Sequence, residues 1–116
     1  MSKLSDLQED LTPKEVAALL ERGEVDLVDV REPYEHEAGR IAGARHVALA
    51  QLSAQAESFD RERPTVFYCR SGGRSAVATQ AFRASGFHAL NMAGGLLAWD
   101  AQGLPLEPDG GSVADH

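Results

Sequence analysis

The chain has 116 residues, of which 43% are hydrophobic and 25% are charged, a balance typical of one soluble globular domain with its own core. Its formal net charge of −7 argues against nucleic acid and anionic membranes as partners, since both are negatively charged themselves. The single cysteine excludes an internal disulfide, and we find neither a signal peptide nor the roughly 20 consecutive apolar residues that span a bilayer, so we expect a cytoplasmic protein.

The first helix is predicted after Thr12, in the stretch LTPKEVAALLERGE. Thr12 can cap its amino end, and Glu15 can complete a capping box with Thr12. Apolar residues recur at helical spacing, and Gly23 is expected to end the helix. A short strand near Leu7–Leu11 has weaker support, whereas the apolar run in EVDLVDVRE is typical of a strand buried on both faces.

The sequence of the middle of the chain predicts further short helices and strands. EPYEHEAGRIAGARHVAL contains a helical turn, a loop with two glycines and a strand at about Ala44–Leu49, and AQLSAQAESF is a weak helix. TVFYC, residues 65–69, is a second buried strand. SAVATQAFRASGF is expected to form a helix that ends at Gly86, with an apolar face made of Val77, Ala78, Ala81 and Phe82.

The last third of the sequence predicts one more strand, in HALNMAG, and a short helix in GGLLAWDAQGLP, which Trp99 anchors to the core. Residues 107–116 have little apolar content, so we expect a mobile tail after a single domain at 1–106. Strands that alternate with helices predict an α/β domain whose mostly parallel sheet is covered by helices on both faces.

Three chemically active residues follow predicted strands. Cys69 stands at the carboxyl end of one buried strand, and Asp29 and Arg31 stand at the carboxyl end of another. Parallel strands bring these ends to one edge of the sheet, which is where ligands bind in open α/β sheets. We therefore expect the three residues to lie at one site.

Cys69 opens a loop that is rich in arginine and glycine, YCRSGGRSA. A thiol becomes a strong nucleophile as the thiolate, which positive potential stabilises. Arg70, Arg74 and the amino end of the following helix are expected to supply that potential. Gly72 and Gly73 let the backbone curl so that N–H groups point inward. A structural cysteine beside a surface turn would need neither the arginines nor the glycines, so the loop favours a site for an anionic intermediate on sulfur.

Three blocks of the sequence resemble, in order, the rhodanese family of sulfurtransferases: DVREPYEHEAGRIAGARHV (29–47), FYCRSGGRSAVA (67–78) and GGLLAWDAQGLP (94–105). The resemblance implies a compact α/β domain with a five-stranded, mainly parallel sheet. It also implies that Cys69 accepts a sulfane sulfur as a persulfide and delivers it to a nucleophilic acceptor. Family members commonly have a histidine where this chain has Arg40, a departure outside the cysteine loop.

The same resemblance assigns roles to individual residues around Cys69. Asp29 and Arg31 would support the loop and its neighbouring helix through charge-assisted hydrogen bonds. Arg70 and Arg74 would face the anionic donor. The residues that would form the pocket floor and begin the helix behind it are Arg70, Ser71, Gly72, Gly73, Arg74 and Ser75.

The length of the loop discriminates between two uses of a thiolate. Four residues separate Cys69 from Arg74, whereas cysteine phosphatases have five at the equivalent place. A shorter loop makes a smaller pocket, which favours sulfur transfer over hydrolysis of a phosphate ester. A cysteine-dependent phosphatase, an arsenate reductase and a non-catalytic module that carries a persulfide remain as alternatives.

The four histidines do not form a metal-ligand spacing with one another or with Cys69, so we expect neither a metal nor another cofactor. His36 and His46 are expected on the surface rather than as a base for the thiol. The resemblance implies a small anionic sulfur donor such as thiosulfate, and a thiol or cyanide as the acceptor. A protein as sulfur acceptor is left open.

Overall fold

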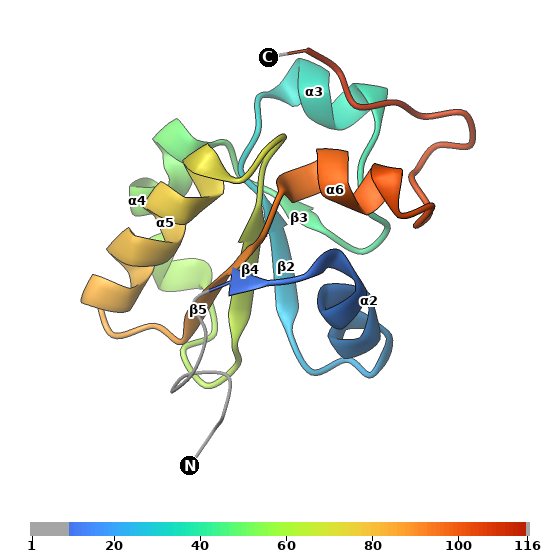
Figure 1. Cartoon of the computed structure of the whole chain (residues 1–116). Helices are drawn as coiled ribbons and strands as arrows, with labels where there is room; N and C mark the ends of the chain where they lie inside the picture. Colours follow the sequence, from blue (N-terminus) through green and yellow to red (C-terminus); the bar gives the residue numbers. More distant parts are fainter. Residues whose placement is uncertain (1–9, 116) are drawn as a thin grey trace.

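A five-stranded parallel sheet forms the centre of the protein, shown in Figure 1 as a computed structural model that describes residues 10–115. The strand order is β1-β5-β4-β2-β3, and every pairing is parallel. This confirms the predicted α/β architecture. The strands are Asp10–Leu11 (β1), Asp26–Asp29 (β2), Arg45–His46 (β3), Thr65–Tyr68 (β4) and Ala89–Met92 (β5).

The structure describes one predicted strand in part and shortens another. Of the segment Leu7–Leu11, Asp10 and Leu11 form β1, and the three residues before them lie outside the described residues. The strand predicted at about Ala44–Leu49 is reduced to β3. The N–H groups of Val47 and Leu49 still donate to the carbonyls of Asp29 and Val30, so the chain follows β2 beyond the end of β3.

Helices cover both faces of the sheet, with α4 and α5 on one face and α2 and α6 on the other (Figure 1). The helices are Pro13–Glu21 (α2), Pro33–Ala38 (α3), Leu52–Gln55 (α4), Gly73–Ala84 (α5) and Gly95–Ala101 (α6), and 3₁₀ turns at Leu49–Gln51 and Ala56–Ser58 flank α4. Among residues 10–115, no helix is both long and apolar enough to cross a membrane.

Side chains of the strands alternate between two hydrophobic clusters, one on each face. Val66 and Tyr68 of β4 join α2 and α6, whereas Phe67 and Cys69 join α4 and α5. Trp99 of α6 is 3% exposed and donates its indole N–H to the Pro105 carbonyl at 2.8 Å, as expected of a core anchor. The alternation turns Cys69 toward the amino end of α5.

Local signals in the sequence account for α2. The Thr12 side chain accepts a hydrogen bond from the Glu15 N–H at 3.2 Å, and the Glu15 carboxylate accepts one from the Thr12 N–H at 2.8 Å. This confirms the predicted capping box. The helix ends before Gly23, which has a φ of +69°, a left-handed conformation that glycine adopts without strain.

The predicted apolar face of α5 is half wrong. The buried residues of this helix are Ser75, Ala78, Thr79 and Phe82, whereas Ala81 is exposed and Val77 is 60% exposed. The helix turns two hydroxyl groups inward because both have partners there. Ser75 contacts the sulfur of Cys69, and the Thr79 hydroxyl donates to the Ser75 carbonyl at 2.8 Å.

Residues 107–115, which we call the C-terminal segment, run past α3 (Figure 1). Arg40 and Glu107 exchange backbone hydrogen bonds of 2.8 and 2.7 Å, and the Ser112 N–H donates to the Ala38 carbonyl at 2.8 Å. Val113 packs against the cluster that contains Trp99. The segment therefore has defined contacts with the domain, and its mobility stays a prediction.

Candidate active site

Cys69 directly follows β4 and is 1% exposed. The loop after it leads into α5, whose N-cap is Gly72. Gly72 has a φ of +108°, in the region that other residues rarely adopt, so a glycine at this position lets the loop turn into the helix. The side-chain amide of Asn91 on β5 donates to the Gly72 carbonyl at 3.4 Å.

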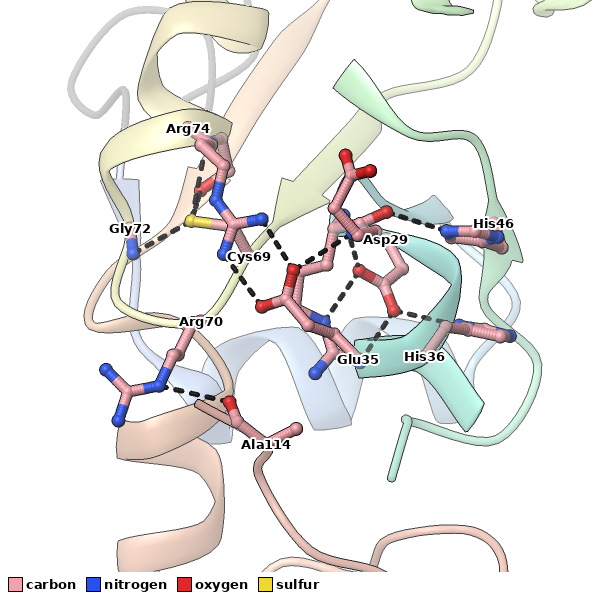
Figure 2. Close-up of polar contacts among 12 residues, drawn as sticks. Asp29, Glu35, His36, His46, Cys69, Arg70, Gly72, Arg74 and Ala114 are labelled. Carbon is pink, nitrogen blue, oxygen red and sulfur yellow. Dashed lines mark hydrogen bonds and ion pairs between the residues drawn. The ribbon is translucent and has the colours of Figure 1, made fainter. Parts of the chain in front are cut away.

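The sulfur of Cys69 is surrounded by hydrogen-bond donors (Figure 2). It lies 3.1 Å from the Gly72 nitrogen, 3.4 Å from the Ser75 nitrogen and 3.3 Å from the Ser75 hydroxyl. Burial disfavours the charged thiolate, but hydrogen bonds from the Ser75 side chain and from the backbone outweigh this effect. The pKa of Cys69 is therefore lowered from its ordinary value, which favours the nucleophilic form.

The amino end of α6 fixes the outer side of the same loop. The N–H groups of Leu96 and Leu97 donate to the carbonyls of Cys69 and Arg70 at 2.8 and 3.0 Å. Gly95 makes this approach possible, because a Cβ atom there would overlap both carbonyl groups. The loop carbonyls thus point toward α6, which leaves N–H groups of the loop for the sulfur.

Arg74 pairs with Glu35 of α3 through two hydrogen bonds, of 2.8 and 2.9 Å (Figure 2). The Glu35 side chain is fully buried, and that of Arg74 is 20% exposed. The hydrogen bonds to Glu35 raise the pKa of Arg74, and the negative charge of Cys69 acts in the same direction. Arg74 therefore interacts electrostatically with the thiolate, while it donates its hydrogen bonds to the Glu35 carboxylate.

Glu35 is the main residue that sequence reasoning missed. Its carboxylate also accepts the Glu32 N–H at 3.0 Å, at the start of α3. One signal in the sequence could have indicated it. An arginine in a loop beside a buried thiol needs a carboxylate partner, and Glu35 lies in the same sequence block as Asp29 and Arg31.

Asp29 and Arg31 form a fully buried ion pair at the end of β2. Arg31 donates to the two carboxylate oxygens of Asp29 at 2.9 and 2.7 Å, and to the Gly39 carbonyl at 2.7 Å. Burial raises the pKa of Asp29, but hydrogen bonds and charge from Arg31, with His36, lower it overall. The pair contacts the segment that carries Glu35, so any support it gives the cysteine loop is indirect.

His36 and His46 were expected on the surface, which is wrong in part, because both are half-buried. Their rings stack with centroids 4.4 Å apart. His36 Nδ1 lies 2.8 Å from an Asp29 oxygen, and His46 Nε2 lies 2.7 Å from the Arg31 carbonyl. Both imidazoles thus belong to the buried Asp29 network, whereas the Cys69 sulfur has its hydrogen bonds from Gly72 and Ser75.

Arg70 points away from the sulfur and toward the C-terminal segment (Figure 2). Its Nε donates to the Ala114 carbonyl at 3.2 Å, and its Nη2 lies 3.3 Å from an Asp115 oxygen. That Arg70 and Arg74 face the donor therefore stays a prediction, since both guanidinium groups have other hydrogen-bond partners here. Within residues 10–115, no group of three or more His, Cys, Asp or Glu residues could hold a metal.

Known proteins are similar to most of the chain. Residues 12–102 match the family described as Rhodanese-like domain. A protein of Allochromatium vinosum named Sulfurtransferase is 35% identical over 94 residues, 79% of this chain and 88% of that protein. Thiosulfate sulfurtransferase GlpE of Coxiella burnetii is 31% identical over 84 residues, 72% of this chain and 78% of that protein.

Solved structures agree with the sequence comparison. A rhodanese-related protein from Thermoplasma volcanium superposes with a TM-score of 0.79 and 23% identity, over 84% of this chain and 96% of that one, which supports the fold alone. Some relatives are longer, and the chain spans 54% and 59% of two of them. The matched residues include the buried pair Asp29–Arg31 at the end of β2 and the whole cysteine loop. The chain therefore belongs to the family of rhodanese-like domains, as its three sequence blocks predicted.

Proposed function

We propose that the protein is a sulfurtransferase that carries a sulfane sulfur as a persulfide on Cys69. The observation that carries this proposal is the set of donors around the sulfur, two N–H groups and one hydroxyl at 3.1–3.4 Å. Such donors stabilise negative charge on sulfur before and after transfer. Relatives named as sulfurtransferases support the same reaction class.

In the first half-reaction, the Cys69 thiolate attacks the outer sulfur of a donor such as thiosulfate. A new S–S bond forms, the S–S bond of thiosulfate breaks, and sulfite leaves with the bonding electron pair. The loop N–H groups of Ser71, Gly72 and Ser75 stabilise the thiolate at the start. The same groups, with Gly73 and Arg74 at the start of α5, line the space for the terminal sulfur.

In the second half-reaction, cyanide or a thiolate attacks the terminal sulfur of the persulfide. Thiocyanate or an acceptor persulfide leaves, and the Cys69 thiolate is regenerated, which completes a double displacement. No general base is required, because the resting sulfur is already stabilised as an anion. The chain has one cysteine, so no second thiol of the same chain competes with the acceptor.

The expected partners are a small anionic sulfur donor and a thiol, cyanide or protein acceptor. We expect the reaction to run without a metal or another cofactor, in the cytoplasm, where thiols stay reduced. These points rest on the chemistry of a lone, stabilised thiolate.

Turnover assays separate this function from its rivals. Wild-type protein with thiosulfate and cyanide should form thiocyanate, and the Cys69→Ser variant should form none. A phosphatase would instead hydrolyse an aryl phosphate in a Cys69-dependent manner without transferring sulfur. A persulfide carrier would take up sulfur but release it negligibly to cyanide, which would contradict the enzymatic part of the proposal.

A further inference from the structure

The C-terminal segment holds the residue next to the nucleophile. Arg70 follows Cys69 directly, and its guanidinium group is bonded to the Ala114 carbonyl and to the Asp115 carboxylate. The two contacts join positions 44 and 45 residues apart in the sequence. A carboxylate of the chain itself therefore binds a guanidinium group one residue from the nucleophile, which is otherwise a binding group for an anionic donor at Cys69.

The base of this segment is built into the fold. Its backbone pairs with Arg40 and with Ala38 of α3. Two glycines allow the close approach: a Cβ atom on Gly39 would overlap the Ser112 backbone, and one on Gly111 would crowd the carbonyl of Ala38. Residues 107–113 thus have a fixed course that places Ala114 and Asp115 beside the cysteine loop.

The contact at the end of the segment is weak by comparison. The Asp115 side chain is 99% exposed, and that of Arg70 is 32% exposed. Ion pairs with so much solvent around them stabilise little and are screened by salt. An anion that binds beside Cys69 could therefore displace the carboxylate while residues 107–113 stay in place.

We propose that Asp115 is a specificity-determining residue, whose carboxylate competes with anionic sulfur donors for Arg70. The proposal rests on the function given above, because it takes the donor to be an anion that reacts at Cys69. Asp115 lowers the affinity for small anions and leaves the reaction with neutral molecules unaffected.

Alkylation of Cys69 tests the competition without any sulfur transfer. The chain has one cysteine, so iodoacetate, an anion, and iodoacetamide, its neutral analogue, both report on the same thiol. The ratio of the two rates cancels any change in the ionisation of Cys69. In Asp115→Asn we expect the rate of alkylation by iodoacetate, divided by the rate of alkylation by iodoacetamide, to rise about two- to fivefold. The rise should disappear near 1 M salt.

Asp109→Asn is the matched control, because Asp109 is an exposed residue of the same segment and its loss changes the net charge equally. It should leave the ratio unchanged. Asp115→Asn should also have no effect in an Arg70→Gln background. An unchanged ratio in Asp115→Asn, an equal rise in Asp109→Asn, or a rise that persists without Arg70 would each overturn the proposal.

Thiosulfate then separates this inference from the proposed function. The thiosulfate concentration that half-maximally loads Cys69 with sulfur should fall about two- to fivefold in Asp115→Asn and stay unchanged in Asp109→Asn. Equal values for all three proteins would overturn the role of Asp115 while leaving sulfur transfer intact. If the alkylation ratio shifts but thiosulfate loads no sulfur onto any of them, the proposed function fails and the control of anion access stands.

Discussion

Glu35 and Arg74 connect two parts of the protein that are 39 residues apart in the sequence. The pair ties α3, at the end of β2, to the first turn of α5, where the hydrogen bonds to the Cys69 sulfur originate. Because the carboxylate is fully buried, its negative charge needs this partner. The geometry of the thiolate site therefore depends on an acid that does not touch the sulfur.

Glu35→Gln should destabilise the protein. The substitution leaves a mostly buried guanidinium group without its counter-charge, a change that costs about 3–5 kcal/mol in fully buried pairs. Because Arg74 is 20% exposed, we expect the free energy of unfolding to fall by about 2–3 kcal/mol. Chemical denaturation measures this loss. Glu37→Gln, at an exposed position of the same helix, should change the value by less than about 0.5 kcal/mol, and equal losses would contradict the account.

Ser75→Ala should raise the pKa of Cys69. Burial raises this pKa, and the hydrogen bond that the Ser75 hydroxyl donates to the sulfur at 3.3 Å is one of those that lower it. The rate of alkylation by iodoacetamide, measured against pH, reports the fraction of Cys69 that is thiolate. The midpoint of this curve should move to higher pH in Ser75→Ala. Below the midpoint we expect the variant to react about tenfold more slowly than the wild type. Ser53→Ala, at an exposed position in α4, is the control; an unshifted midpoint in Ser75→Ala would show that the hydroxyl does not stabilise the thiolate.

Two neighbouring glycines of the loop should respond differently to alanine. Gly72 has a φ of +108°, whereas Gly73 lies in α5, and a Cβ atom added there would have open space around it. Gly72→Ala should lower the free energy of unfolding by about 1–3 kcal/mol, because alanine is strained in that conformation. Gly73→Ala should leave it unchanged or raise it by up to about 1 kcal/mol. Thermal unfolding measures both variants. A Gly73→Ala protein that is less stable than the Gly72→Ala protein would mean that the loop does not turn at Gly72.

Acid should remove the contribution of Asp29 to stability. The folded-state pKa of Asp29 is lowered from 3.8, so the unfolded chain takes up this proton first as the pH falls. The stabilisation is therefore complete above about pH 5 and is lost as the pH drops below 3.8 toward the folded-state value.

Asp29→Asn tests that assignment. It should cost about 3–5 kcal/mol at neutral pH, because Arg31 is left buried and unpaired, and it should flatten the dependence of unfolding free energy on pH below about 4. Asp100→Asn, at an exposed position in α6, should keep the wild-type slope. A wild-type slope in Asp29→Asn would place the acid sensitivity elsewhere.

Local signals predicted most of the fold. The capping box of α2, the buried apolar strands and the glycines that end helices act through near neighbours, and the structure has them where the sequence indicated. The placement of Cys69 beside the end of β2 followed from parallel topology. Such features depend on a few adjacent residues or on a general rule, so a single sequence suffices.

The features that the sequence did not predict depend on contacts between distant residues. Ser75 and Thr79 face inward because one bonds the sulfur and the other bonds the Ser75 carbonyl, which hydrophobic periodicity does not register. The choice of Glu35 as the partner of Arg74 depends on how α3 packs against α5, and the course of the C-terminal segment depends on its approach to Gly39. Hydrogen bonds and ion pairs between residues far apart in the sequence leave no periodic pattern in it.

The central claim is that Cys69 carries the transferred sulfur, and the intact mass of the protein tests it most directly. Wild-type protein treated with thiosulfate should gain the mass of one sulfur atom and lose it again when cyanide is added. The Cys69→Ser protein should keep its mass through both treatments. A sulfur atom gained by Cys69→Ser, or a wild-type mass that thiosulfate leaves unchanged, would contradict the claim.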